Sequence, residues 1–256
     1  MLAVPPSLHD LSSEHGFSLL ELLVAMVAGM VLTFATFSLL ELATNQTSRA
    51  TDYVQASQLG RTAMNHIVDQ LNSTCVAENS DPVLGTSTSE ALFFVTAFSK
   101  KTEIQPSEVQ EHEIYWKKTS GEIGSLYDEK WIAESKKNAT EWTFKTKAAS
   151  TVLIDPDIVR YTNPKTGARE IFQYFKYEKE VKSGEISSLQ EIQLKSPELG
   201  SEASHVAAVT VNFRSLPADK NEKLGRYVDL SSQVTFAFSA GFTEPTVVST
   251  GACQNQ

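Results

Sequence analysis

Residues 17–40 read FSLLELLVAMVAGMVLTFATFSLL and contain one ionisable side chain, Glu21, and no proline. The stretch has 24 residues (40 − 17 + 1). As an α-helix it would be roughly 36 Å long, enough to cross the hydrocarbon core of a membrane with some tilt. The stretch therefore predicts one membrane-spanning helix close to the N-terminus.

A cleaved signal peptide is the competing interpretation of an apolar stretch in this position. The preceding residues 1–16, MLAVPPSLHDLSSEHG, contain no Lys or Arg. The apolar run is longer than the roughly 7–15 residues of a typical signal, and the small-residue site near Ala43 is a poor cleavage site. We therefore expect the helix to be retained as an anchor.

Glu21 is the unusual residue of this helix, since a charged side chain costs about 2.5–3.5 kcal/mol near the centre of a membrane. It lies close to one end of the span. It either snorkels to the membrane interface or has a function inside the membrane, and its position alone leaves both open.

Residues 16–21, GFSLLE, followed by an unbroken apolar helix, resemble the N-terminal signature of type IV prepilins and pseudopilins. The resemblance implies that a prepilin peptidase cuts after Gly16 and methylates the amino group of Phe17. It also makes Glu21 the fifth residue of the mature chain. A buried carboxylate and a buried amino group neutralise each other in a filament core, so Glu21 would set the register between subunits.

One further feature extends this resemblance, and another departs from it. Residues 57–71 look like the second half of the helix in PilW-type minor pilins and in the J-type minor pseudopilin. The leader carries Asp10 and Glu14 where many members have basic residues, so the positive-inside rule does not support a cytoplasmic N-terminus. Orientation, with an extracytoplasmic head, rests on the family resemblance.

The pattern of apolar residues predicts an α+β fold, with a long N-terminal helix packed on a mainly antiparallel β-sheet head. The expected parts are a leader (1–16), a membrane-spanning half-helix (17–40), an amphipathic half-helix (41–74) and a β-rich head (75–256). One apolar face recurs at three- and four-residue spacing in the second half-helix. Its members are Tyr53, Ala56, Leu59, Ala63, Met64, Ile67, Val68 and Leu71. We expect the helix to end between Asn72 and Cys75.

Short β-like runs begin after Pro82. They are Ala91–Phe98, Glu113–Trp116, Glu141–Phe144, Ile171–Tyr177, Val206–Phe213 and Gln233–Phe238. The charged segments 99–112, 117–140 and 178–204 are expected to be surface loops or insertions.

The chain has two cysteines, Cys75 and Cys253. The resemblance places both outside the cytoplasm, where disulfides persist. Pairing them would close a loop of 178 residues (253 − 75), for which chain entropy gives roughly 5 kcal/mol at most. We favour a disulfide, with two free thiols as the alternative.

The polar residues give little support for a catalytic or metal site. His66 and Asp69 have the spacing of a surface pair on a helix, and residues 111–113, EHE, are expected at a solvated strand edge. Residues 155–157, DPD, are better explained as a turn than as a calcium site, which needs six to eight oxygen ligands. We expect no metal, no cofactor and no small-molecule substrate.

The chain carries a formal net charge of −9 and 41% hydrophobic residues. It lacks the clustered Lys and Arg that nucleic-acid binding requires, and its composition fits a packed head. We expect a structural, non-enzymatic subunit whose partners are prepilin peptidase, other pilin or pseudopilin subunits and the membrane. The alternative is a membrane-anchored extracytoplasmic enzyme or binding protein with a coincidental motif.

Overall fold

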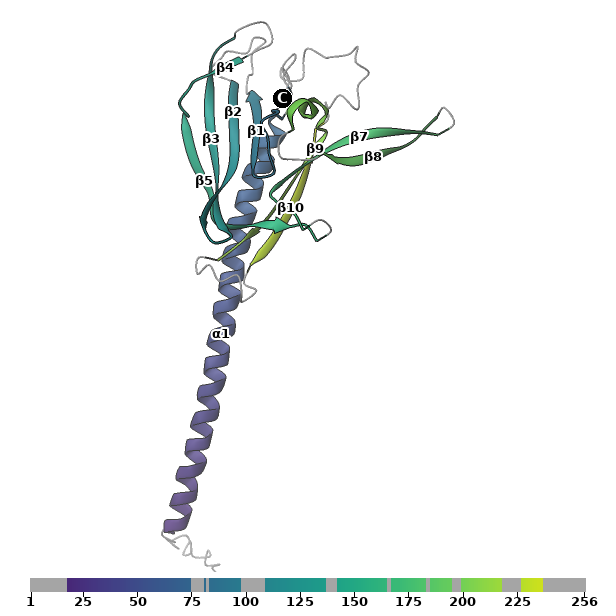
Figure 1. Ribbon diagram of the computed structural model, residues 1–256. Coiled ribbons are helices and arrows are strands. Elements are labelled where there is room, and N and C mark those ends of the chain that lie inside the picture. The colour runs from purple at the N-terminus through teal and green to yellow at the C-terminus, as the bar shows by residue number, and fades with distance from the viewer. Residues whose placement is uncertain are drawn as a thin grey trace, which may run out of the picture. The chain divides into compact units, whose positions relative to one another are not determined.

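The protein is described here from a computed structural model (Figure 1). The described residues are 18–74, 81, 83–97, 109–136, 142–164, 167–182, 185–194, 199–217 and 227–236. The chain divides into two compact units, residues 1–50 and 51–256.

One long helix, α1 (Leu19–Asn72), crosses the boundary between the units. It contains no proline, so no backbone hydrogen bond is lost within it. Ser18 precedes the helix, and its Oγ accepts a hydrogen bond of 3.2 Å from the backbone N–H of Glu21. The predicted helix and its end near Asn72 are confirmed.

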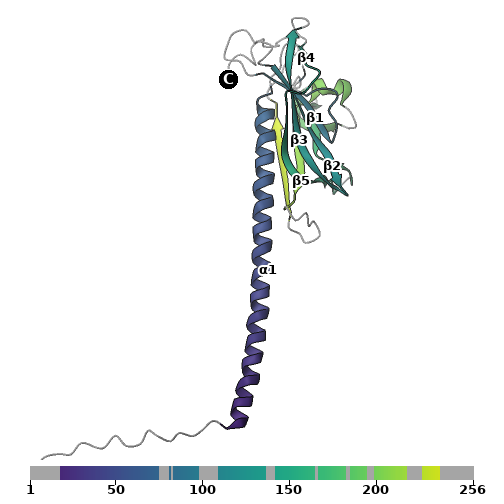
Figure 2. The same ribbon diagram turned by 90° about the vertical axis from the view of Figure 1, so that its left-hand side faces the viewer.

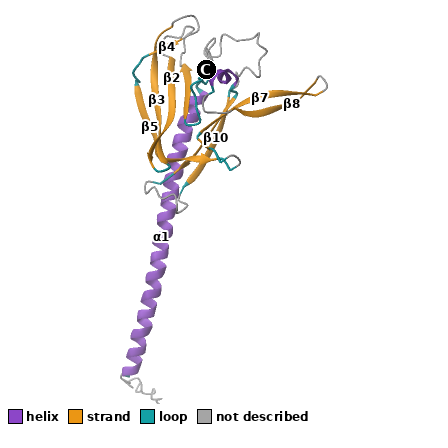
Figure 3. Cartoon of the chain, in the orientation of Figure 1, coloured by secondary structure: helices purple, strands orange, loops and turns teal. Residues whose placement is uncertain are grey.

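The second unit contains a sheet whose strand pairs are all antiparallel among the described residues (Figure 3). Its strands are β1 (Ala91–Ala97), β2 (Val109–Ser120), β3 (Ile123–Lys136), β4 (Trp142–Phe144), β5 (Ser150–Thr162), β6 (Arg169–Glu170), β7 (Phe172–Lys182), β8 (Glu185–Leu194), β9 (Ala208–Ser215) and β10 (Val228–Thr235). A short 3₁₀ helix, η2 (Gly200–His205), precedes β9. The α+β prediction, a long helix on a mainly antiparallel sheet, is confirmed.

The strands follow the order β1-β2-β3-β5-β9-β7-β8, and β10, β4 and β6 pair with β9, β3 and β5. Strand β9 is the centre of the head. Along one edge it pairs with β10 over its whole length. Its other edge is shared, because Ala208–Val211 pair with β7 and Phe213–Ser215 pair with β5.

The core lies between the sheet and the C-terminal part of α1, and strand β10, yellow in Figure 2, runs beside that part of the helix. The buried residues of α1 recur at three- and four-residue spacing, as expected for a helix with one apolar face. They are Ala56, Gly60, Ala63, Met64, Ile67 and Leu71. From β9, Val209, Val211 and Phe213 are fully buried on the side that joins this core.

Two details of the predicted helix face were wrong. Tyr53 is 52% exposed, so the packed face begins later, at Ala56. Gly60 is buried although it was not assigned to the face, because a glycine contributes no hydrophobic signal to a periodicity.

The prediction of surface loops at 99–112, 117–140 and 178–204 was wrong where the chain is described. Strand β2 begins at Val109, β3 occupies most of the second segment, and β7 and β8 form a hairpin across the third. Five of the 14 residues of β3 are charged (Asp128, Glu129, Lys130, Glu134 and Lys136). This composition hid a strand that contains five buried residues (Gly124, Ser125, Leu126, Asp128 and Ala133). Residues 99–108 lie outside the described part.

The turn predicted at 155–157 is also wrong, because these residues lie inside β5. The register between β3 and β5 shifts there, from Gly124↔Ile158 to Leu126↔Asp155. Proline is tolerated in a strand at such an irregularity, since its missing N–H removes no ladder bond. The Pro156 carbonyl accepts a 2.7 Å hydrogen bond from the Ser125 hydroxyl.

Candidate functional site

The N-terminal part of α1 exposes its apolar side chains on every side. From Leu19 to Leu42 the exposed fraction of the large apolar residues ranges from 53% at Leu23 to 83% at Leu19. No residue from Ser18 to Ala50 is buried. An apolar helix of this kind needs a hydrocarbon or protein environment that the rest of the described chain does not supply.

The hydroxyl groups of this segment are suited to such an environment. Five of them donate hydrogen bonds of 2.7–3.0 Å to helix carbonyls three or four residues earlier. They belong to Thr33, Thr36, Ser38, Thr44 and Thr47. Because a bilayer offers no water, polar groups that are satisfied within the helix cost less there.

Within the described residues, α1 is the one helix long and apolar enough to span a membrane. Its length and composition allow the span, and it lies near the N-terminus. Together with the exposed apolar surface, this fits a membrane-anchored, single-pass protein.

Glu21 lies in the first turn of α1, three residues after Ser18. The Ser-x-x-Glu spacing is that of a capping box, a signal absent from the sequence-based prediction. The backbone N–H of Glu21 donates to Ser18 Oγ, and a carboxylate at a helix N-terminus interacts favourably with the helix dipole. Glu21 thus lies at a capped helix start, where its charge is favourable.

In the second unit, α1 approaches the sheet closely at Gly60. A Cβ placed on Gly60 would lie 2.2 Å from Leu230 Cδ1 and 2.7 Å from Ser215 Cβ. A residue with a side chain therefore requires the helix or the strands β9 and β10 to move. Gly60 sets the distance at which the helix lies on the sheet.

Next to this contact, a carboxyl group is buried in the sheet. Asp155 is fully buried. Its carboxylate accepts a hydrogen bond of 2.9 Å from the Ser215 hydroxyl and one of 3.1 Å from the Asp157 N–H. Burial raises the pKa of Asp155 to about 6, and the two hydrogen bonds lower it only in part. Both carboxylate oxygens bond to protein groups, which favours a structural role over the calcium site considered from the sequence.

A histidine pair joins α1 to the sheet through one carboxylate. His66 Nε2 lies 2.9 Å from Asp128 Oδ2, and His112 Nδ1 lies 2.9 Å from Asp128 Oδ1. His112 also stacks on Phe94, with ring centroids 5.2 Å apart. Burial opposes ionisation of Asp128, but the hydrogen bonds and charges of the two histidines outweigh it and lower the pKa of Asp128.

This cluster corrects two predictions. His66 was expected to pair with Asp69 on the helix surface, but it contacts Asp128 of β3. His112 was expected at a solvated strand edge, but β2 pairs with β1 and β3 and His112 is only 3% exposed. Asp128 is 62 residues from His66 and 16 residues from His112, so local spacing could not identify it as their partner.

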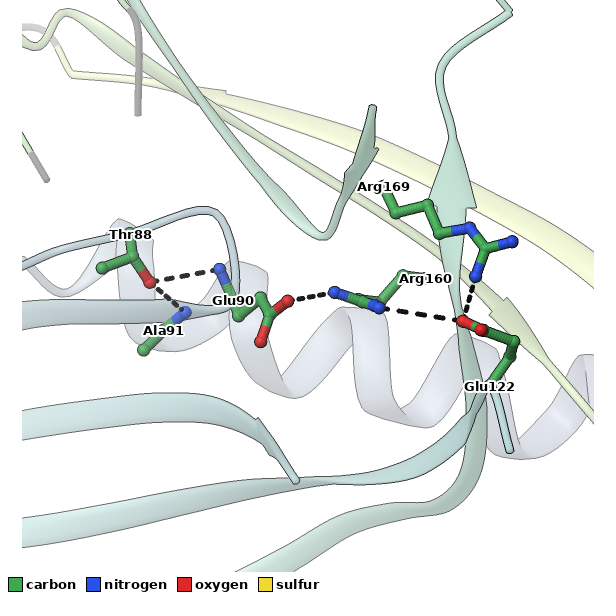
Figure 4. A network of polar contacts seen from close by, with 6 residues as sticks. All are labelled: Thr88, Glu90, Ala91, Glu122, Arg160 and Arg169. Atoms are coloured by element: carbon green, nitrogen blue, oxygen red, sulfur yellow. Dashed lines mark hydrogen bonds and ion pairs between the residues drawn. The ribbon is translucent and has the colours of Figure 1, made fainter. Parts of the chain in front are cut away.

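A second polar network links four segments of the head through ion pairs (Figure 4). The Arg160 guanidinium pairs with Glu90 and lies 3.7 Å from Glu122, which also pairs with Arg169. It lies 4.5 Å from the ring centroid of Trp116. The network connects strands β5 and β6 with the turns before β1 and β3, so it holds these segments of the head together.

The residues predicted for processing and crosslinking, Gly16, Phe17, Cys75 and Cys253, lie outside the described residues. Among the residues that the structure describes, no group of three or more His, Cys, Asp or Glu is placed to hold a metal ion.

Comparison with known proteins identifies one match. Residues 11–37 match the family described as "Prokaryotic N-terminal methylation motif". The match supports a type IV pilin-like protein, a class whose members are typically structural. No curated protein and no solved structure matches the chain significantly.

Proposed function

We propose that the chain is a structural subunit, a minor pilin or pseudopilin, that is processed by prepilin peptidase and assembled into a type IV pilus or a secretion or competence pseudopilus. The observation that carries the proposal is the methylation motif at 11–37, which overlaps an apolar helix with no buried residue from Ser18 to Ala50. Before assembly this surface lies in the cytoplasmic membrane, and afterwards it packs against equivalent helices.

Processing takes place between Gly16 and Phe17 in this proposal. It removes residues 1–16 and leaves a methylated amino group on Phe17. The head, residues 75–256, then lies outside the cytoplasm, with 17–40 as the membrane and assembly segment and 41–74 as the amphipathic half-helix. The match at 11–37 spans the cleavage position and supports this reading.

Glu21 pairs with the amino group of a neighbouring subunit in the assembled filament. Apart from this carboxylate, the apolar run of 24 residues has no charge, so the surroundings of Glu21 in a bundle of such helices are hydrocarbon. A buried carboxylate is strongly disfavoured unless it is paired, which makes Glu21 selective for one axial position. The capping contact at Ser18 supports this, because it holds the first helical turn in place.

Cys75 and Cys253 form a disulfide that ties the end of the chain to the end of α1. The proposed location of the head outside the cytoplasm supports this bond. The sequence resemblance of residues 57–71 supports the finer assignment to PilW-type minor pilins or the J-type minor pseudopilin. Partners are accordingly prepilin peptidase and other subunits of the same filament.

Incorporation of a Glu21→Ala variant into filaments tests the proposal. The variant is expected to reach the membrane normally, because removal of a charge favours insertion. Its amount in sheared filaments should fall at least tenfold. Glu41→Ala is the matched control, since Glu41 is another exposed glutamate of the same helix and should not change incorporation. Equal incorporation of the Glu21→Ala and Glu41→Ala variants would remove the register role.

A further inference from the structure

The sheet carries a cavity of about 440 Å³ on the face of β9 that points away from α1. Side chains opposite each other in an antiparallel pair share a face, and they alternate along each strand. Thr210 of β9 lies opposite both Gln173 of β7 and Gln233 of β10, and Asn212 lies opposite Ser231. All five line the cavity. Val209 and Val211, which alternate with Thr210 and Asn212 along β9, point to the opposite face and join the core.

The cavity exists because the sheet curls toward this face. In a flat sheet β8 and β10 are three strand spacings apart, about 14 Å. The Gln233 side chain of β10 nevertheless donates a hydrogen bond to Glu191 Oε1 of β8. Twist or curvature of the sheet brings these two side chains within reach of one another. The cavity is therefore formed mainly by strand residues, and Asn163 and Pro164 of the segment after β5 complete its lining.

Side-chain amides form the polar lining and are held in place by one another. Asn212 Nδ2 donates a hydrogen bond of 3.2 Å to Gln173 Oε1, and Gln173 Nε2 donates one of 2.8 Å to the Glu170 carboxylate. An amide has two N–H groups and two acceptor lone pairs. Within the described contacts, Gln173 uses one N–H and one lone pair, so a donor and an acceptor remain side by side. Such fixed amides suit a ligand that both donates and accepts.

The remaining lining sets the charge and shape of that ligand. Tyr161 and Phe175 contribute aromatic rings, and no Lys or Arg is among the described lining residues. Of the two carboxylates, Asp229 pairs with Arg214 at 2.8 Å and Glu191 accepts from Gln233. The cavity thus opposes anions, and the Glu191 carboxylate, which a neutral amide does not neutralise, is an acceptor for a ligand hydroxyl.

We propose that this concavity, defined by Tyr161, Gln173, Phe175, Glu191, Asn212 and Gln233, binds a neutral saccharide of one or two rings. A sugar ring presents hydroxyl groups that donate and accept at its rim and C–H groups on its faces, which match amides and aromatic rings respectively. The volume lies within the roughly 300–1,000 Å³ of small-molecule sites. An extended peptide fits less well, because the floor strands β7 and β9 are paired along both edges and, within the described residues, the unpaired edges of β8 and β10 lie only at the rim. The site does not depend on filament assembly.

Ligand-observed saturation-transfer NMR on the full chain tests the proposal. The chain is purified in lauryldimethylamine oxide, a detergent without a sugar headgroup. The probes are glucose, galactose, N-acetylglucosamine, lactose and N,N′-diacetylchitobiose, with glycerol and acetyl-tetraalanine amide as non-saccharide controls. We expect at least one saccharide to bind with a Kd of about 1 mM, and neither control to bind.

Three variants localise the binding. Gln173→Ala and Gln233→Ala should each weaken it at least tenfold, and Val152→Ser, at a 47% exposed position outside the cavity, should leave it unchanged. Near-ultraviolet circular dichroism confirms that each head is folded, and Gln233 is exposed, so its replacement should not disturb the core. The proposal is overturned if no saccharide binds, if both amide variants bind as the wild type does, or if the tetraalanine peptide binds instead.

Discussion

The two halves of helix α1 have the same backbone geometry and differ in what surrounds their apolar side chains. Up to Ala50 no residue is buried, although the segment is the most apolar of the chain. From Ala56 to Leu71 the helix is more polar, yet six residues on one face are buried against the sheet. The arrangement of apolar residues, more than their number, determines which half belongs to the head. An apolar surface on every side suits a hydrocarbon environment, and a single apolar stripe suits packing on the core.

The largest expected difference between the halves comes from a matched pair of truncations. Ile67 is fully buried, so Ile67→Ala should lower the free energy of unfolding of the head by roughly 2–5 kcal/mol. Val31 is 63% exposed, so Val31→Ala should leave it unchanged. Thermal and denaturant unfolding of the full chain in detergent, followed by near-ultraviolet circular dichroism, measures both. Similar losses of stability in the two variants would show that the two halves of α1 do not differ in their contribution to the head.

The next effect concerns the buried carboxyl group at the helix contact. Burial raises the pKa of Asp155 from 3.8 to about 6, so the folded chain holds a proton that the unfolded chain releases at lower pH. Stability should therefore fall as pH rises from about 4 to 6, by roughly 3 kcal/mol at most. Asp155→Asn can keep both hydrogen bonds, because the Ser215 hydroxyl can also accept, and it should remove this decline.

Unfolding of the wild type and Asp155→Asn at pH 4, 5, 6 and 7 measures the effect. The variant should be the more stable chain at pH 7, and the difference should shrink toward pH 4. An equal slope in both chains would show that Asp155 does not hold the extra proton.

A smaller effect, of opposite sign in the two halves, is expected from a pair of glycines. Gly29→Ala meets no atom within 4 Å and should add about 1 kcal/mol of helix propensity without affecting the head. Gly60→Ala gains the same propensity but pushes against Ser215 and Leu230. Overpacking costs about 1–3 kcal/mol, so the net loss in head stability should be about 1 kcal/mol. A more stable head in Gly60→Ala would show that the close contact is not rigid.

The sequence allowed a good prediction of α1 and of the strands that alternate or are strongly apolar, such as β1 and β9. It failed for β3, where five charged residues hid a strand that also contributes buried residues to the head, and for β8 in the β7–β8 hairpin. It also failed for His112, whose glutamate neighbours suggested solvent and whose partner Asp128 is 16 residues away. Periodicity reports one face of one element, and it does not report which elements meet.

The candidate site shows the same division. Glu21 and the apolar helix are local features, so the sequence sufficed to find them. The cavity on β9 combines residues from five strands and the segment after β5. Its residues are spaced along the chain from Tyr161 to Gln233, and the amides among them look like ordinary surface residues until the sheet is known.

The central claim is that the chain is processed after Gly16 to begin the assembly half of α1. The direct measurement is the mass of the N-terminal peptide of the protein isolated from cells that contain prepilin peptidase. We expect a chain that begins with N-methylated Phe17. An intact Met1, or a chain that begins near Thr44, would contradict it.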